Sequence, residues 1–188
     1  MSRMVLLVPR MFTEEEFKGF VPVLPEDFRS RTMEFWDYVE EKLRAYVGKI
    51  QRVYRDEISE GGEKALSRLS NIDHESFVLV KKLVENGSSF EATEDSTLVA
   101  ESLSWLEVTR HNPIDRISLE MYEETIRERD NLVSRRIDET LREGETALLF
   151  LKPGLTISLD ESVKIFRVCR FDPMDYLRSW QVQLESKR

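Results

Sequence analysis

The stretch Thr146-Ala147-Leu148-Leu149-Phe150-Leu151 contains one of the two longest unbroken apolar runs of the chain, from Ala147 to Leu151, the other being Met4 to Val8. Gly144 precedes it and Pro153-Gly154 follows it, so residues 146–151 are predicted to form a strand. The run is far shorter than the ~20 apolar residues that span a bilayer. No membrane is therefore expected as a partner.

Further strand candidates lie along the chain, and helical patterns rather than tight hairpins separate them. They are residues 4–8, 50–54, 89–92 and 163–169. Helices are expected between Thr13 and Gly19, at 31–47, 63–70, 75–86, 96–108 and 116–142, and from Asp172 onward. Crossover connections of this kind imply a mainly parallel sheet of about five strands flanked by helices, which is an α/β fold. Residues 1–188 are expected to form a single domain.

Two of these helices carry informative patterns. Helix 75–86 is apolar nearly all round, which predicts a well-buried element. On the long helix 116–142, Arg129 and Asp130 lie on the apolar stripe. Because charged side chains are rarely buried without partners, at least one of these two is expected to be buried and paired. Arg129 either extends along the edge of the stripe, or holds a substrate oxyanion or a neighbouring carboxylate.

The composition is that of a globular chain. Of 188 residues, 28 are Lys or Arg and 36 are Asp or Glu, which gives a formal charge of −8. This acidic balance disfavours nucleic acid and anionic membranes as partners. The single cysteine, Cys169, excludes an intramolecular disulfide and fits a cytoplasmic location. With two histidines and one cysteine, a structural zinc site of four such ligands cannot form within one chain.

Charged residues follow the predicted strands, at the edge where ligand sites of parallel sheets lie. Three acids are expected to converge there with cations nearby, because the carboxyl ends of parallel strands meet at one edge. Such carboxylates could share a proton, activate a water or bind a hard cation. The sequence therefore predicts no certain cofactor and at most a weak Mg²⁺ or Mn²⁺ site. In the alternative, each acid only caps the helix that follows it.

The candidate site residues fall into three groups. The candidate catalytic residues are Asp56, Glu94, Asp95 and Arg129. The candidate ligand-binding residues are Arg10, Arg55, Glu63, Asp130 and Lys152. The candidate metal ligands are Asp56, Glu94 and Asp95.

Short motifs between about residues 50 and 155 resemble those of a known group. They are Val53-Tyr54-Arg55-Asp56 with Gly62-Glu63, Phe90-Glu91-Ala92-Thr93-Glu94-Asp95, and Arg129-Asp130 followed by the predicted strand 146–151. The set resembles an uncharacterised prokaryotic family similar to the TraB/PrgY, ChaN and erythromycin-esterase-like group. This resemblance implies an α/β domain with acidic residues and histidines at its strand ends, and a hydrolytic, often metal-dependent activity. The chain departs from that pattern, with Lys152 at the position of a glycine and Leu155 at that of a histidine.

The missing histidine favours a domain that has lost catalysis and that binds a small ligand or a protein partner. The rival interpretation is a carboxylate-based hydrolase, dependent on Mg²⁺ or Mn²⁺, in which Arg129 orients the substrate. A structural subunit of a larger assembly is the third. The last helix carries Leu177, Trp180 and Leu184 on one side, which cover either the protein's own sheet or a second subunit. We expect a homodimer, with this helix or Trp105 in the contact.

Overall fold

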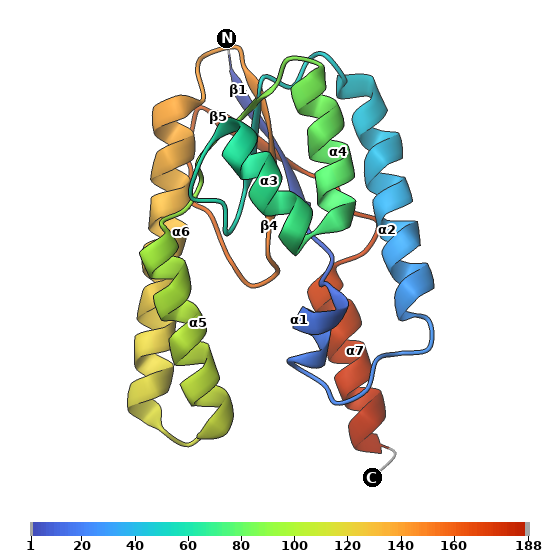
Figure 1. Cartoon of the computed structure of the whole chain (residues 1–188), viewed down its shortest axis with the longest axis vertical. Coiled ribbons are helices and arrows are strands. Elements are labelled where there is room, and N and C mark those ends of the chain that lie inside the picture. The colour runs from blue at the N-terminus through green and yellow to red at the C-terminus, as the bar shows by residue number, and fades with distance from the viewer. Residues whose placement is uncertain (1, 187–188) are drawn as a thin grey trace.

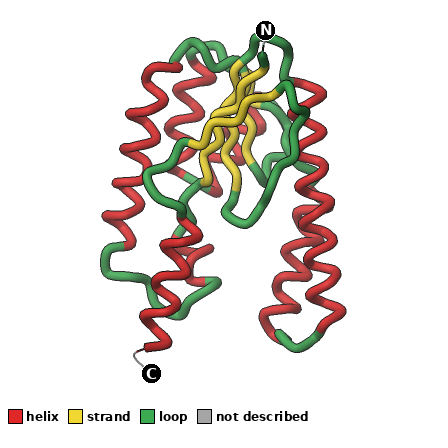
Figure 2. Tube along the Cα trace, turned by 180° about the vertical axis from the view of Figure 1, so that it is seen from behind, coloured by secondary structure: helices red, strands yellow, loops and turns green. Residues whose placement is uncertain are grey.

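The computed structural model describes residues 2–186 and contains a five-stranded parallel sheet of order β3-β2-β4-β1-β5 (Figure 2). The strands are β1 (Arg3–Pro9), β2 (Arg52–Arg55), β3 (Ser89–Phe90), β4 (Thr146–Leu151) and β5 (Val163–Arg167). The predicted α/β fold is confirmed, and each strand lies close to its expected bounds.

Helices connect the strands and cover the sheet. They are α1 (Glu14–Lys18), α2 (Phe28–Leu43) with the 3₁₀ turn η1 (Arg44–Tyr46), α3 (Gly62–Ile72), α4 (His74–Glu85), α5 (Ser96–His111), α6 (Arg116–Thr140) and α7 (Pro173–Ser186). Several begin at a capping side chain that accepts a hydrogen bond from the first turn, namely Thr13, Asp73, Asp95 and Asp115. Short polar side chains therefore set where these helices start.

β4 is the middle strand of the five, between β1 and β2. Leu148 lies beside Leu6 of β1 and beside Val53 of β2. Successive residues point to opposite faces of a strand, so Leu148 and Phe150 enter one hydrophobic core while Leu149 enters the other. Since both faces are covered, the strand can be apolar throughout.

The sheet separates two hydrophobic cores. The larger core lies between the sheet and helices α1, α2, α3, α4 and α7 (Figure 1). The smaller core lies on the other face, against α6 and the apolar residues of the segment 155–159. Together these layers bury most of the sheet on both faces. The exceptions lie on the edge strands, where Ser89 of β3 and Ile165 and Phe166 of β5 are exposed.

Helix α4 corrects one expectation. Val80 and Leu83 are buried, but Val78 is 53% exposed. The helix covers the sheet from outside, so one of its faces meets solvent although its sequence is apolar nearly all round. On α6, Leu119 is exposed as well, because this part of the helix runs beyond the sheet.

Helix α7 covers the protein's own core, which was one of the two alternatives for its apolar stripe. Leu177 is buried against the larger core, and Trp180 packs at its edge. The indole Nε1 of Trp180 also donates a hydrogen bond to the carbonyl of Val23 at 2.7 Å. The stripe of α7 is therefore used within the chain.

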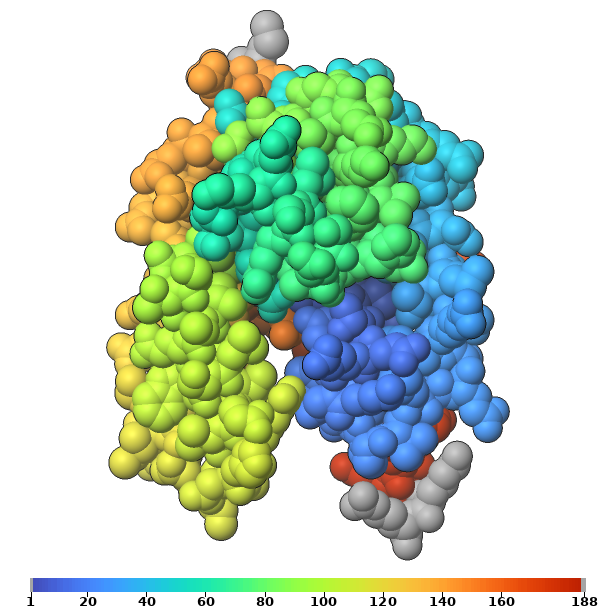
Figure 3. Space-filling model, viewed as in Figure 1, coloured from blue at the N-terminus to red at the C-terminus, as the bar shows by residue number. Residues whose placement is uncertain are grey.

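Two lobes extend beyond the carboxyl edge of the sheet. One is the antiparallel hairpin of α5 and α6, and the other contains α1 and α7 (Figures 1 and 2). The space-filling view shows a hollow between the lobes, below α3 (Figure 3). The fold thus places a cleft at the sheet edge where the strands end.

Candidate functional site

The carboxyl ends of the strands carry a buried network of charged side chains. Arg10 follows β1, Arg55 ends β2, Glu94 comes after β3, and Lys152 follows β4. The side chains of Arg10 and Arg55 are among the largest that are fully buried in the described chain. Burial of so many charges requires that they neutralise one another.

Asp56 is the centre of this network. Its Oδ1 accepts hydrogen bonds from Arg10 Nε at 3.1 Å and from Arg55 Nη1 at 3.0 Å. Arg10 also donates to both carboxylate oxygens of Glu16, at 2.8 and 2.7 Å. Burial alone would raise the pKa of Asp56, but the two guanidinium groups outweigh it and lower that pKa below its usual value. Asp56 is therefore an ionised and fully engaged carboxylate, poorly suited to accept a proton as a general base.

Glu94 and Arg129 form a second buried ion pair, which joins the end of β3 to α6. Arg129 donates to the Glu94 carboxylate through Nε at 2.7 Å and through Nη2 at 3.0 Å, and its Nη1 donates to Ser102 Oγ at 2.8 Å. Burial raises the pKa of Glu94 in spite of this partner. The prediction that Arg129 is buried and paired is confirmed, and its partner is a carboxylate at the strand ends.

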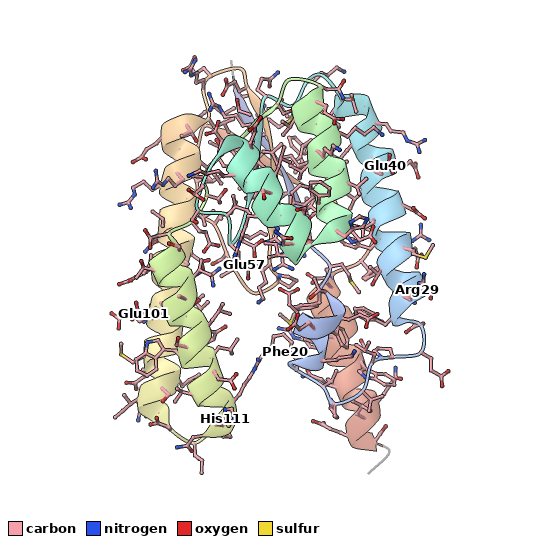
Figure 4. The ribbon with its side chains drawn as sticks, in the orientation of Figure 1. Phe20, Arg29, Glu40, Glu57, Glu101 and His111 are labelled. Atoms are coloured by element: carbon pink, nitrogen blue, oxygen red, sulfur yellow. The ribbon has the colours of Figure 1, made fainter. Side chains whose placement is uncertain are left out.

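Lys152 is held less tightly than these arginines. Its Nζ lies 3.5 Å from Glu16 Oε1 and 4.0 Å from Glu57 Oε1. Both distances are longer than a charge-assisted hydrogen bond. Glu57 lies at the same edge, between the two lobes (Figure 4). Lys152 therefore keeps capacity to bind a further acceptor.

The cleft between the lobes opens onto these charges. One part, which we call the hairpin pocket, has a volume of about 420 Å³ and is lined mainly by apolar residues of α5, α6 and the turn after β4. Arg129, Asp130 and Lys152 are among its charged residues. The adjoining part, which we call the Arg55 pocket, has a volume of about 360 Å³ and also contains Lys152 and Phe20. Lys152 thus stands where the two parts meet.

Asp130 lies in the wall of the hairpin pocket and links α6 to the segment after β4. Its carboxylate accepts hydrogen bonds from the backbone N–H of Thr156 at 3.1 Å and from the Thr156 hydroxyl at 2.9 Å. Burial raises the pKa of Asp130. This predicted ligand-binding residue therefore lies in the cleft, where it also fixes the position of a wall segment.

Two predicted site residues lie elsewhere. Asp95 accepts hydrogen bonds from the backbone N–H groups of Thr97 and Leu98, at 2.8 and 3.2 Å, and so caps α5. Glu63 is exposed in the first turn of α3, outside the cleft. For these two residues the alternative of a local role at a helix start describes the structure better than a role in the cleft.

The acids do not form the predicted metal site. Within residues 2–186, no three His, Cys, Asp or Glu side chains come together in a way that could hold a metal ion. The physical reason is that Asp95 is used as a helix cap, while arginines bind Asp56 and Glu94. The predicted grouping of Asp56, Glu94 and Asp95 as metal ligands is therefore corrected.

Several residues of the cleft escape prediction from the sequence. Glu16 has the spacing of a capping box with Thr13, and it does accept a hydrogen bond from the Thr13 N–H at 2.9 Å while it binds Arg10. Glu57 directly follows Asp56, so extending the strand-end rule by one residue would have found it. The role of Ser102 has no sequence signal, because it depends on how α5 packs on α6.

Comparisons with family models, curated proteins and solved structures gave no match to this chain. Among the helices of residues 2–186, none combines the length and the apolar composition needed to cross a membrane. The chemistry of the cleft is therefore the basis for a functional proposal.

Proposed function

We propose that the protein binds a small organic molecule in the hairpin pocket. One observation carries this proposal. The pocket has an apolar wall built by α5 and α6, and it also contains the cationic side chains of Arg129 and of Lys152, which directly follows strand β4. Ligand sites of open α/β sheets lie at this edge. The volume of about 420 Å³ is within the usual range for small-molecule pockets.

The rival function, a carboxylate-based hydrolase, receives less support from the geometry. A hydrolase of this kind needs a carboxylate that is free to take up a proton or to bind a metal ion. Arg10 and Arg55 bind Asp56, and Arg129 binds Glu94 through two hydrogen bonds. The arrangement therefore favours binding without catalysis, as proposed for a degenerate relative of the TraB/PrgY and ChaN group.

The cytoplasmic location and the homodimer that the sequence suggests are further proposals. Half-buried Cys169, as a free thiol, agrees with a reducing compartment. The sequence placed the dimer contact at α7 or Trp105, but α7 packs on the protein's own core and Trp105 is half-buried. Ile114 and Ile117, near the tip of the α5–α6 hairpin, are 90% and 69% exposed and would supply an apolar surface for a second copy instead. Light scattering over a tenfold range of concentration tests the dimer, and a constant monomer mass would contradict it.

The binding proposal can be tested with a neutral dye. N-phenyl-1-naphthylamine becomes strongly fluorescent when it enters an apolar pocket. Leu106 lies in the wall of the hairpin pocket, so Leu106→Glu should weaken dye binding about tenfold, which corresponds to ~1.4 kcal/mol. Fluorescence titration of the wild type and of this variant measures the change.

A matched control lies on the same helix. Val108 of α5 is exposed and lies outside the cleft, so Val108→Glu adds the same charge without changing the pocket. We expect this variant to bind the dye like the wild type. Equal binding by the wild type, Leu106→Glu and Val108→Glu, or no dye binding at all, would overturn the proposal.

A further inference from the structure

Lys152 lies in the floor of the cleft, and the two carboxylates nearest to it also interact with other donors. Glu16 already receives two hydrogen bonds from Arg10 and one from the Thr13 N–H. Glu57 lies 3.4 Å from Arg55 Nη1. Because both acids have other donors, Lys152 can turn to a new anion without leaving a buried carboxylate unpaired.

The arginines of the floor are already committed. Arg10 binds Asp56 and Glu16, while Arg129 binds Glu94 and Ser102. A phosphate dianion is usually received by the planar fork of a free arginine, or by several cations together. Two further arginines line the cleft: Arg127 is exposed on α6, where Glu123 shares the pocket wall, and Arg110 lies over the ring of Phe20. Among the described residues of the floor itself, Lys152 is the loosely held cation. This charge pattern suits a ligand with a single negative charge.

The space beside Lys152 is apolar. Leu106, Tyr122, Ile126, Pro153 and Met174 line the hairpin pocket next to it. Burial of an alkyl or aryl group against these side chains would supply most of the binding free energy. The charged end of such a ligand would then meet Lys152 at the junction with the Arg55 pocket.

We propose that the ligand of the hairpin pocket is an amphiphilic monocarboxylate, whose carboxylate pairs with Lys152 Nζ and whose apolar body lies against α5 and α6. This inference rests on the proposed function and adds the chemical class of the ligand. Arg55, which lines the adjoining pocket, is bound through its Nη atoms to Asp56 and Asp73, while its buried Nε has no hydrogen-bond partner among the described residues. The floor therefore has more donor capacity than its own carboxylates use.

The test compares ligands of eight carbon atoms that differ in the head group. Octanoate, octanamide, octylammonium and octyl phosphate are each titrated against the protein, with calorimetry to measure the dissociation constant. We expect octanoate to bind about tenfold more tightly than octanamide, as for a hydrogen bond to a charged group. The comparison uses the wild-type protein alone, so it does not depend on whether a variant folds.

Variants at Lys152 test whether this lysine causes the preference for octanoate. Lys152→Met should remove the preference for octanoate and leave octanamide binding unchanged, while Lys152→Arg should keep the preference. Lys164 is exposed on β5, so Lys164→Met is the matched control and should behave like the wild type.

The outcomes separate this inference from the proposed function. If octanamide, octylammonium or octyl phosphate binds as tightly as octanoate, or if the preference survives in Lys152→Met, the inference is wrong while binding in the hairpin pocket stands. If no octyl compound binds and the neutral dye does not bind either, both fail. If the dye alone binds, the pocket stands and the amphiphilic monocarboxylate is overturned.

Discussion

The Arg129–Glu94 pair crosses from α6 to the end of β3, and each charge depends on the other for its burial. Arg129 is 3% exposed and Glu94 is 2% exposed. Replacing one partner leaves the other as an unpaired buried charge. We therefore expect Arg129→Met to lower the free energy of unfolding by about 3–5 kcal/mol. Equilibrium denaturation in urea measures this loss.

Two further variants sharpen this prediction. Arg135 is exposed on the same helix, so Arg135→Met should change stability by less than about 0.5 kcal/mol. The double variant Arg129→Met with Glu94→Gln should recover part of the loss, because no charge then remains unpaired. If Arg129→Met unfolds at the wild-type urea midpoint, the pair has no structural role.

The ion pair between Glu16 and Arg10 should make the free energy of unfolding depend on pH. Burial would raise the pKa of Glu16, but the hydrogen bonds and the charge of Arg10 outweigh it and lower the pKa well below its usual value. A carboxylate with a lowered folded-state pKa stabilises the fold above its unfolded pKa of ~4.3, and this contribution is lost as the pH falls. Glutamine can keep the capping box without the charge. Glu16→Gln should thus be less stable than the wild type by about 1.5–3 kcal/mol at neutral pH.

The difference between Glu16→Gln and the wild type should shrink as the pH falls below ~4.3, because the Glu16 carboxylate of the unfolded chain takes up a proton there while that of the folded chain stays ionised. Urea denaturation over a series of pH values follows this change. Glu15 is the exposed neighbour in the same helix, and Glu15→Gln should follow the wild type at every pH. A gap between Glu16→Gln and the wild type that stays constant with pH would show that the charge of Glu16 does not contribute.

At the scale of the elements, α6 holds the extended segment 155–160 by a ladder of side chains. Asp130, Ser134 and Asp138 on the helix accept hydrogen bonds from the backbone N–H groups of Thr156, Ser158 and Asp160. Four residues of a helix rise ~6 Å and two residues of an extended chain rise ~6.6 Å, so the two spacings match. The residues in between, Leu155, Ile157 and Leu159, pack on the smaller core.

The hydrogen bonds of Asp130 in this ladder should contribute to the stability of the protein. Asp130→Ala removes the acceptor for the Thr156 N–H and hydroxyl, which should lower stability by about 1–3 kcal/mol. Hydrogen exchange at the Thr156 amide should become faster, because this hydrogen bond is lost. Asn131 is exposed next to it, so Asn131→Ala is the control and should leave this amide protected. Unchanged exchange in Asp130→Ala would show that packing alone holds the segment.

Strands β1 and β4 were predictable because each contains an apolar run between clear breaks, as with Val5 to Val8 before Pro9. The ladder was not, since it depends on the register between α6 and a segment without regular secondary structure. The exposure of Val78 on α4 also could not be read from the sequence, because an all-apolar helix pattern does not show which face meets the sheet.

Part of the candidate site was predictable from the sequence, because its residues follow the predicted strands. The rule that parallel strands end at one edge correctly brought together Arg10, Arg55 and Asp56, which form ion pairs there. It could not decide that Asp95 turns away to cap α5. It also could not find the hairpin pocket, because the wall of this pocket depends on how α5 and α6 pack beyond the sheet.

At the scale of the whole molecule, a contact between the lobes spans the cleft. The Arg110 guanidinium of α5 lies over the ring of Phe20, with Cζ 5.3 Å from the ring centroid. A Cβ at Gly19 would lie 2.7 Å from Arg110 Nη2, so the absence of a side chain at Gly19 leaves room for this contact. Phe20 lines both parts of the cleft, and the contact therefore fixes how far the hairpin stands from α1.

Loss of this contact should let the hairpin move. A cation–π pair at an exposed site contributes about 0.5–1 kcal/mol, enough to shift an open–closed equilibrium about two- to fivefold. Glu101 and Arg29 lie on opposite sides of the molecule (Figure 4), so spin labels at Glu101→Cys and Arg29→Cys in a Cys169→Ser background report the separation of the lobes. In Arg110→Ser, pulsed electron paramagnetic resonance should give a broader distance distribution shifted to longer distances.

Arg116→Ser removes an exposed arginine of α6 that pairs with Glu120, and should leave the distribution unchanged. Identical distributions for Arg110→Ser and the unmodified pair would mean that packing of α5 on α6 alone positions the hairpin.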